Sequence, residues 1–169
     1  MRMFKAALLL VLVATPWAGA AWAQAGEGPP PSVAVFPLEL LDTSGEPPRA
    51  DQERRLRMLD GLLRTLLAES GRYAPVEARL PEGSPQIRNC NRCDVAEAER
   101  LGAGLALSGV VQKVSNLILS LTLTLREVPS GRVRATWSAD FRGNTDESWE
   151  RALRWLLRNR LLAPPEPAR

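Results

Sequence analysis

Leucine occupies every odd position from Leu117 to Leu125, and three of the four residues between are serine or threonine. This period of two predicts a β-strand with one buried face, because successive side chains of a strand point to opposite faces. The flanking runs 105–114 and 132–141 are also strand-like, and turn-forming residues separate the three runs. The pattern predicts a three-stranded antiparallel meander whose middle strand, 117–128, places its odd-numbered leucines in the core.

Apolar residues recur at a 3.6-residue period in three other segments, which predicts amphipathic helices at 51–70, 93–101 and 145–162. Short β-branched or aromatic runs predict two further strands, at 32–38 and 73–77. Turn-forming residues at 41–50 predict a surface loop. The order β-α-β-α-β-β-β-α predicts an α+β fold, an αβ sandwich whose mixed sheet carries its helices mainly on one face.

The amino-terminal pattern is that of an export signal. Arg2 and Lys5 precede the short apolar run 6–14, and Ala23-Gln24-Ala25 supplies the small residues of a cleavage site. We expect a signal peptide at 1–25, a flexible lead at 26–32, a single αβ domain at 33–162 and a Pro-rich tail at 163–169. No cysteine near the cleavage site can take a lipid, and no later run is long enough to span a bilayer. The mature protein is expected to be periplasmic, soluble and not lipidated.

Composition removes several function classes. The formal charge of +3 falls to +1 without Arg2 and Lys5, which gives little support for a nucleic-acid or anionic-membrane partner. Histidine is absent, which excludes Ser-His-Asp and Cys-His mechanisms and the commonest zinc and haem ligand sets. We therefore predict no catalytic residues, no metal site and no cofactor, and we expect that the protein is not an enzyme.

Cys90-Asn91-Arg92-Cys93 forms a CxxC motif directly before the predicted short helix. In an oxidising compartment, two cysteines in a loop rich in turn residues favour a local structural disulfide. The alternative is a redox-active pair, because a helix N-terminus and Arg92 would both favour a thiolate. The motif leaves both interpretations open.

Topology indicates a second candidate site. The third predicted strand ends near Val114, the fourth begins near Leu117 and the fifth ends near Phe141, so these three points share one edge of the sheet. The polar residues placed there are Lys113, Ser115, Asn116, Arg142, Asn144, Thr145 and Asp146, and Glu39 and Asp42 join them if the first strand runs parallel to the third. Ligands often bind beyond the carboxyl ends of strands and at helix N-termini. The set is either a binding edge or an ordinary group of turn, cap and ion-pair residues.

Three tryptophans follow the predicted signal peptide. Trp137 and Trp149 fall on apolar faces and are expected in the core. Trp155 falls off the main apolar stripe of the last helix, among several arginines. It marks either a partner surface or packing at the edge of the core.

Several short motifs resemble known envelope proteins. The opening run Val33-Ala34-Val35-Phe36-Pro37, the helix end Ser70-Gly71-Arg72-Tyr73 and the segment from Leu101 to Val111 resemble the amino-terminal domain of TolB and the periplasmic domain of CsgG. The segments 113–119 and 142–149 resemble a family of secreted bacterial proteins of unknown function. The resemblance implies a periplasmic αβ module.

Together these features predict a non-enzymatic binding or accessory module that engages an envelope protein partner or a small ligand at the strand-end edge. The alternative function is a thiol-active or cofactor-handling accessory protein that uses Cys90 and Cys93.

Overall fold

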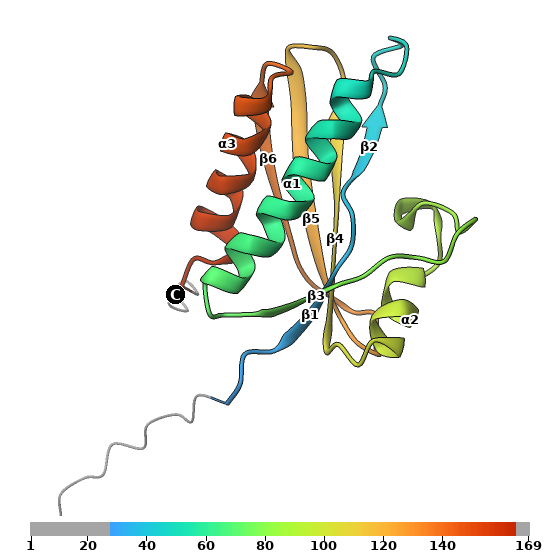
Figure 1. The fold of residues 1–169 in the computed structure, drawn as a ribbon, viewed down its shortest axis with the longest axis vertical. Coiled ribbons are helices and arrows are strands. Elements are labelled where there is room, and N and C mark those ends of the chain that lie inside the picture. Colours follow the sequence, from blue (N-terminus) through green and yellow to red (C-terminus); the bar gives the residue numbers. More distant parts are fainter. Residues whose placement is uncertain (1–27, 165–169) are drawn as a thin grey trace, which may run out of the picture.

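The computed structural model describes residues 28–164, which build a mixed six-stranded sheet with helices on both faces (Figure 1). The strand order is β3-β1-β4-β5-β6, and β2 also pairs with β4. The elements are β1 (Ser32–Val35), β2 (Glu39–Asp42), α1 (Ala50–Glu69), β3 (Ala74–Glu77), a 3-10 turn (Ile87–Asn89), α2 (Cys93–Arg100), β4 (Leu105–Lys113), β5 (Ile118–Glu127), β6 (Val133–Arg142), α3 (Asp146–Leu156) and a π-helical segment (Leu157–Leu161). The predicted α+β fold and its carboxyl-side meander are confirmed.

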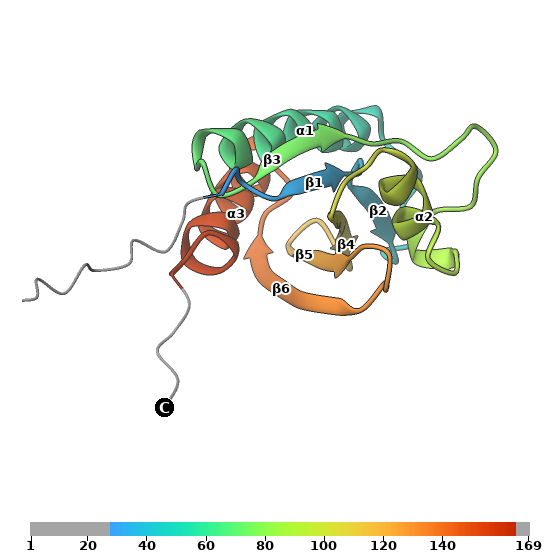
Figure 2. The ribbon, with the colours of Figure 1, turned by 90° about the horizontal axis from the view of Figure 1, so that it is seen from below.

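The two faces of the sheet are covered unequally. Helices α1 and α3 lie side by side on one face, over a core made largely of leucine side chains (Figure 1). Helix α2 packs on the other face, where Ala34, Phe36, Ala98 and Ala106 form a smaller cluster. Figure 2 shows that the sheet curls, so that β6 turns toward α3. The helices therefore lie mainly on one face, as the sequence predicts.

The predicted first strand, 32–38, is wrong in detail. The structure has two short strands, β1 and β2, and both run parallel to β4. Val35 pairs with Leu107, and Glu39 pairs with Val110. The chain therefore advances four residues from β1 to β2 while β4 advances three. One extra residue therefore bulges out at 36–38, where Pro37 has no N–H to continue the ladder. Strand β2 also replaces the start of the loop predicted at 41–50.

Two neighbours stabilise this bulge. The Leu38 backbone N–H donates to Asp60 Oδ1 of α1 at 2.8 Å, and burial raises the pKa of that carboxyl group. The side chains of Leu38 and Leu123 pack directly against the backbone of Gly109, a position where a Cβ atom would lie 2.5 and 2.6 Å from their methyl carbons. The bulge therefore depends on a residue without a side chain in β4.

The leucines of β5 follow the predicted alternation with one exception. Leu119, Leu121, Leu123 and Leu125 are buried, whereas Leu117 is 56% exposed. Strand β5 begins at Ile118, and Leu117 belongs to the β4–β5 loop. The prediction that Leu117 lies in the core is wrong because the hairpin turn takes four residues, 114–117, rather than two.

The helix predicted at 145–162 divides into two parts. Helix α3 ends at Leu156, and the chain then forms a wider π-helical turn in which the N–H of Leu162 donates to the carbonyl of Leu157 at 2.8 Å. Leu157 and Leu161 are both buried. The wider turn keeps these two side chains on the core face.

Candidate functional site

Lys113 lies at the carboxyl end of β4 with its side chain fully buried. Strand β2 pairs Asp42 with Lys113, which brings a carboxylate to the ammonium group. Lys113 Nζ donates to Asp42 Oδ2 at 3.0 Å, to Ser44 Oγ at 2.9 Å and to Glu46 Oε2 at 2.7 Å. All three protons of the ammonium group are therefore used inside the protein.

These contacts change the ionisation of the groups involved. Burial raises the pKa of Asp42, but hydrogen bonds from Ser44 and Lys113 outweigh it and lower that pKa to about 2. The hydrogen bond from Lys113 is also the main cause that lowers the pKa of Glu46. Burial lowers the pKa of Lys113, and its two carboxylate partners raise it above the ordinary value. The cluster therefore holds one cation and two anions at neutral pH.

A pair of amide side chains continues from this cluster to α1 and α3. Asn116 Nδ2 donates to the two carboxylate oxygens of Glu46 at 2.7 and 3.0 Å, and Asn144 Nδ2 donates to Asn116 Oδ1 at 3.0 Å. Asn144 Oδ1 accepts from Arg55 Nη1 and from Trp149 Nε1, each at 3.0 Å. The β4–β5 loop, the β6–α3 loop and α1 are tied together through one asparagine.

Asp146 begins α3 and pairs with two arginines of α1. Arg54 Nη1 donates to Asp146 Oδ2 at 2.6 Å, and Arg55 Nε donates to Asp146 Oδ1 at 2.8 Å. These hydrogen bonds lower the pKa of Asp146 to about 2. Thr145 caps the helix, because its Oγ1 accepts from the Ser148 N–H at 3.3 Å. The start of α3 is therefore fixed both to α1 and by its own cap.

These contacts form one connected set, which we call the strand-end network: Asp42, Ser44, Glu46, Arg55, Lys113, Asn116, Asn144 and Asp146. Four of them are predicted edge residues, namely Lys113, Asn116, Asn144 and Asp146. As expected, Asp42 joins the edge because its strand runs parallel to β4. Glu39 does not join it, because it pairs with Val110 farther back along β4 and its carboxylate accepts from the Ile87 N–H and from Arg88 Nη1. The sequence did not reveal Arg54 or Arg55, because a helical pattern does not indicate which polar side chains reach another element.

The remaining edge residues have other surroundings. Ser115 Oγ accepts from the N–H groups of Leu117 and Ile118 within its own turn, at 3.2 and 3.1 Å. Arg142 is exposed at the end of β6. Most polar groups at this edge are therefore engaged with other parts of the chain, and a binding role for the edge stays a prediction.

Cys90 and Cys93 form a disulfide, which confirms the predicted pairing. Cys93 is the first residue of α2. Between the two cysteines, Arg92 adopts a left-handed φ of 67° and donates from Nη2 to the carbonyl of Pro129 at 2.7 Å. The motif therefore fixes the entry to α2 against the β5–β6 turn. A redox role for the pair stays a prediction.

Replacing both cysteines with serine is expected to lower the free energy of unfolding by about 2 kcal/mol, the chain-entropy contribution of a very short disulfide loop. Urea denaturation measures the change. Wild-type protein kept reduced by dithiothreitol throughout is the control, and it should match the double variant. Reduction by a mild thiol with no loss of stability would contradict the structural role and favour the redox alternative.

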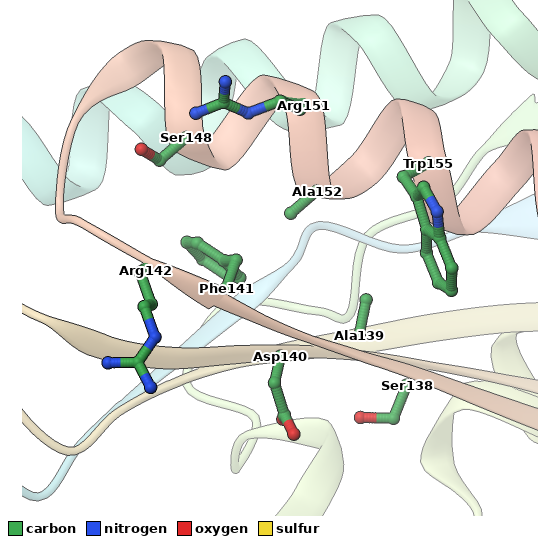
Figure 3. Close-up of a pocket in the computed structure, with 9 residues that line it drawn as sticks. All are labelled: Ser138, Ala139, Asp140, Phe141, Arg142, Ser148, Arg151, Ala152 and Trp155. Carbon is green, nitrogen blue, oxygen red and sulfur yellow. The ribbon is translucent and has the colours of Figure 1, made fainter.

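A groove of about 470 Å³ lies between β6 and α3 (Figure 3). Residues 138–142 of β6 form one side. The other side is a stripe of α3 at i, i+3, i+4 and i+7 spacing, made of Ser148, Arg151, Ala152 and Trp155. Figure 3 shows the side chains of Ala139 and Phe141 pointing toward the helix, whereas those of Ser138, Asp140 and Arg142 point away from it. We call this feature the β6–α3 groove.

The groove combines an exposed aromatic ring with cationic side chains. Trp155 is 41% exposed, and the guanidinium carbon of Arg160 lies 5.8 Å from its ring centroid. Within residues 28–164, neither Arg142 nor Arg151 forms an ion pair, although Arg154 on the same helix pairs with Glu150. The use of Trp155 as a partner surface stays a prediction, but the ring does line an open groove.

The part of the chain that the structure describes offers no evident metal site. There, no group of three or more His, Cys, Asp or Glu side chains could hold a metal ion. None of the helices between residues 28 and 164 combines the length and hydrophobicity that a membrane crossing requires.

Residues 31–161 match the family DUF3280, described as "Protein of unknown function (DUF2380)". The chain belongs to this family. The DUF3280 match includes every strand and helix of the structure and both candidate surfaces. No curated protein matches the chain in sequence.

The solved structures that match this chain include three from bacteria. The PelC dodecamer from Paraburkholderia phytofirmans matches at 13% identity and a TM-score of 0.50, over 77% of this DUF3280 chain and 88% of that chain. Lipoprotein GNA1162 from Neisseria meningitidis matches at 16% identity and a TM-score of 0.49, over 70% of this chain and 85% of that chain. The LpoB C-terminal domain from Salmonella enterica matches at 19% identity and a TM-score of 0.48, over 69% of this chain and 87% of that chain. The PelC match shows a shared fold alone, and the narrower resemblance to TolB and CsgG stays a prediction.

Proposed function

We propose that this protein is a non-enzymatic binding module of the bacterial envelope and that it binds a segment of a partner protein in the β6–α3 groove. The open groove beside Trp155 is the observation that carries the proposal, because it joins an exposed aromatic ring to two arginines that have no ion pair within residues 28–164. Aromatic and arginine side chains are the residues that most often contribute strongly to protein interfaces.

Export and the lack of enzymatic activity belong to the same proposal. The signal peptide at 1–25 and most of the tail at 163–169 lie outside the described residues, so the export signal is supported by the sequence pattern alone. The absence of histidine supports a binding role over the commonest hydrolytic mechanisms.

The groove is a better binding surface than the strand-end network. In the network, Lys113 uses all its donors on Asp42, Ser44 and Glu46, so a ligand would have to displace existing contacts. In the groove, the side chains of Arg142, Arg151 and Trp155 form no hydrogen bond or ion pair within residues 28–164, so a ligand could bind them without displacing one. We therefore place the partner in the groove and assign the network a supporting role.

A photo-reactive amino acid placed at position 151 tests the proposal in the producing bacterium. Position 79 is the matched control, because Arg79 is 69% exposed and follows β3, the strand at the opposite end of the sheet from β6. We expect a discrete cross-linked partner from position 151 and not from position 79, and we expect Trp155→Ala to reduce its yield severalfold.

Two results would contradict this function. Equal capture from positions 151 and 79 would show that the groove is no more adhesive than other surface. Capture from position 151 that Trp155→Ala leaves unchanged would place the partner away from the Trp155 ring and so outside the proposed site.

A further inference from the structure

One backbone hydrogen bond just beyond the end of β6 shows which residues of this strand bond to β5 and which face away from it. The N–H of Gly143 donates to the carbonyl of Leu117 at 3.2 Å, so residue 143 turns its backbone toward β5. Backbone groups alternate in direction along an antiparallel strand. The odd-numbered residues of β6 therefore bond to β5, and Ser138, Asp140 and Arg142 turn their N–H and C=O groups to the free edge.

This edge has no neighbouring strand in the described part of the chain, because β6 ends the strand order. A register shift between Leu125 and Arg126 of β5 disturbs the pairing near Val133, so the regular part of β6 runs from Ala135 to Arg142. Its last five residues are the ones that line the groove. The groove therefore offers a regularly paired strand with one free edge, which is where an extended peptide adds to a sheet.

A strand docked on this edge would direct alternate side chains to two different environments. Those on the helix side would meet Phe141, Ala152 and Trp155, which favour an apolar residue. Those on the open side would lie beside Asp140 and Arg142. Arg151 reaches the groove from α3. The lining residues include two arginines and one aspartate, so charge complementarity favours acidic residues in the occupant.

We propose that the occupant of the β6–α3 groove is an extended acidic segment of a partner protein, which adds to the free edge of β6 and is held by Arg142 and Arg151. The segment alternates acidic residues with at least one apolar residue that packs on Trp155. This inference rests on the proposed function and specifies the chemistry of its partner.

A display library of random eight-residue peptides provides the test. We expect selection on the wild-type protein to enrich peptides in which acidic residues alternate with apolar ones. Against a synthetic enriched peptide, Arg142→Glu with Arg151→Glu should weaken binding roughly tenfold, because each charge reversal replaces attraction with repulsion. Arg79→Glu is the matched charge reversal at the opposite edge and should leave the affinity unchanged.

Backbone methylation separates strand addition from simple charge attraction. The enriched peptide is made in two forms, with N-methyl groups on either the odd or the even amides. A strand directs only alternate amides to its neighbour, so one form should lose at least roughly tenfold in affinity and the other should bind almost normally. Equal effects of the two forms would overturn strand addition.

Other outcomes would overturn the acidic segment itself. Enrichment of basic or uncharged peptides, or no enrichment that depends on Arg142 and Arg151, would overturn the acidic segment. A partner captured from position 151 would still support the proposed function. Concentration-dependent dimerisation abolished by Arg151→Glu, measured by sedimentation, would assign the groove to a second copy of the chain instead.

Discussion

Replacing Lys113 with methionine is expected to lower the free energy of unfolding by roughly 3 kcal/mol, at the low end of the range for breaking a buried ion pair. Methionine keeps the apolar stem but removes the charge, and Asp42 and Glu46 then lie close together without a cation. Both carboxylates remain partly exposed, which limits the loss. Urea denaturation at pH 7 measures the change.

A triple variant serves as the control. Combining Lys113→Met with Asp42→Asn and Glu46→Gln removes all three charges, so it should recover part of the lost stability. If Lys113→Met alone changes the stability by less than about 0.5 kcal/mol, as expected for a surface position, the cluster does not contribute to folding.

The same variant has a defined pH signature. The pKa of Asp42 is lowered from 3.8 to about 2 in the folded protein, so its ionised form stabilises the fold above pH 4, and this contribution is lost as the pH falls toward 2. Without Lys113 the folded pKa of Asp42 moves back toward 3.8, and the loss of stability between pH 4 and 2 becomes smaller. Asp146, which Arg54 and Arg55 hold near the same pKa, titrates in this window in both proteins.

Replacing Gly109 with alanine is expected to cost about 2 kcal/mol of stability, within the range for an overfilled core. The new Cβ would lie 2.5 Å from a methyl carbon of Leu38, 2.6 Å from one of Leu123 and 3.1 Å from the carbonyl oxygen of Thr122. The leucines could rotate away, but only by disturbing the bulge between β1 and β2 that Leu38 closes. Urea denaturation measures the loss.

Gly104→Ala is the matched control for this change. Gly104 lies just before β4 and has no atom within 4 Å of an added Cβ, so the substitution should leave stability within about 0.5 kcal/mol or raise it slightly. Similar effects of the two substitutions would contradict a packing requirement at Gly109.

The sequence predicts the sheet better than it predicts the contacts between elements. Alternating leucines identify β5 because a period of two is typical of a strand with one buried face, and Leu119 to Leu125 are buried as expected. The same alternation could have revealed that Lys113 is buried, since it shares a phase with Leu105, Leu107 and Val111. The prediction instead places Lys113 at the polar edge, because lysine is charged and ends the strand.

Other features depend on geometry that no local pattern carries. Strand β2 follows Pro37 and a one-residue bulge, and its residues Glu39 and Asp42 resemble the loop that comes after them. The β6–α3 groove arises because the sheet curls and α3 packs beside its last strand. The sequence indicated Trp155 as unusual, but it could not show that Arg142 and Arg151 share the same hollow.

The strand-end network also has a consequence for recognition. Asn144 lies in the connection from β6 to α3, Asp146 is the first residue of α3, and Arg55 donates to both of them. The spacing between the two sides of the groove is thereby set when the protein folds. A docking segment would then lose its own conformational freedom but would not have to order its receptor, so a short peptide can bind with useful affinity. Residues that no ligand touches would in this way determine how tightly one is held.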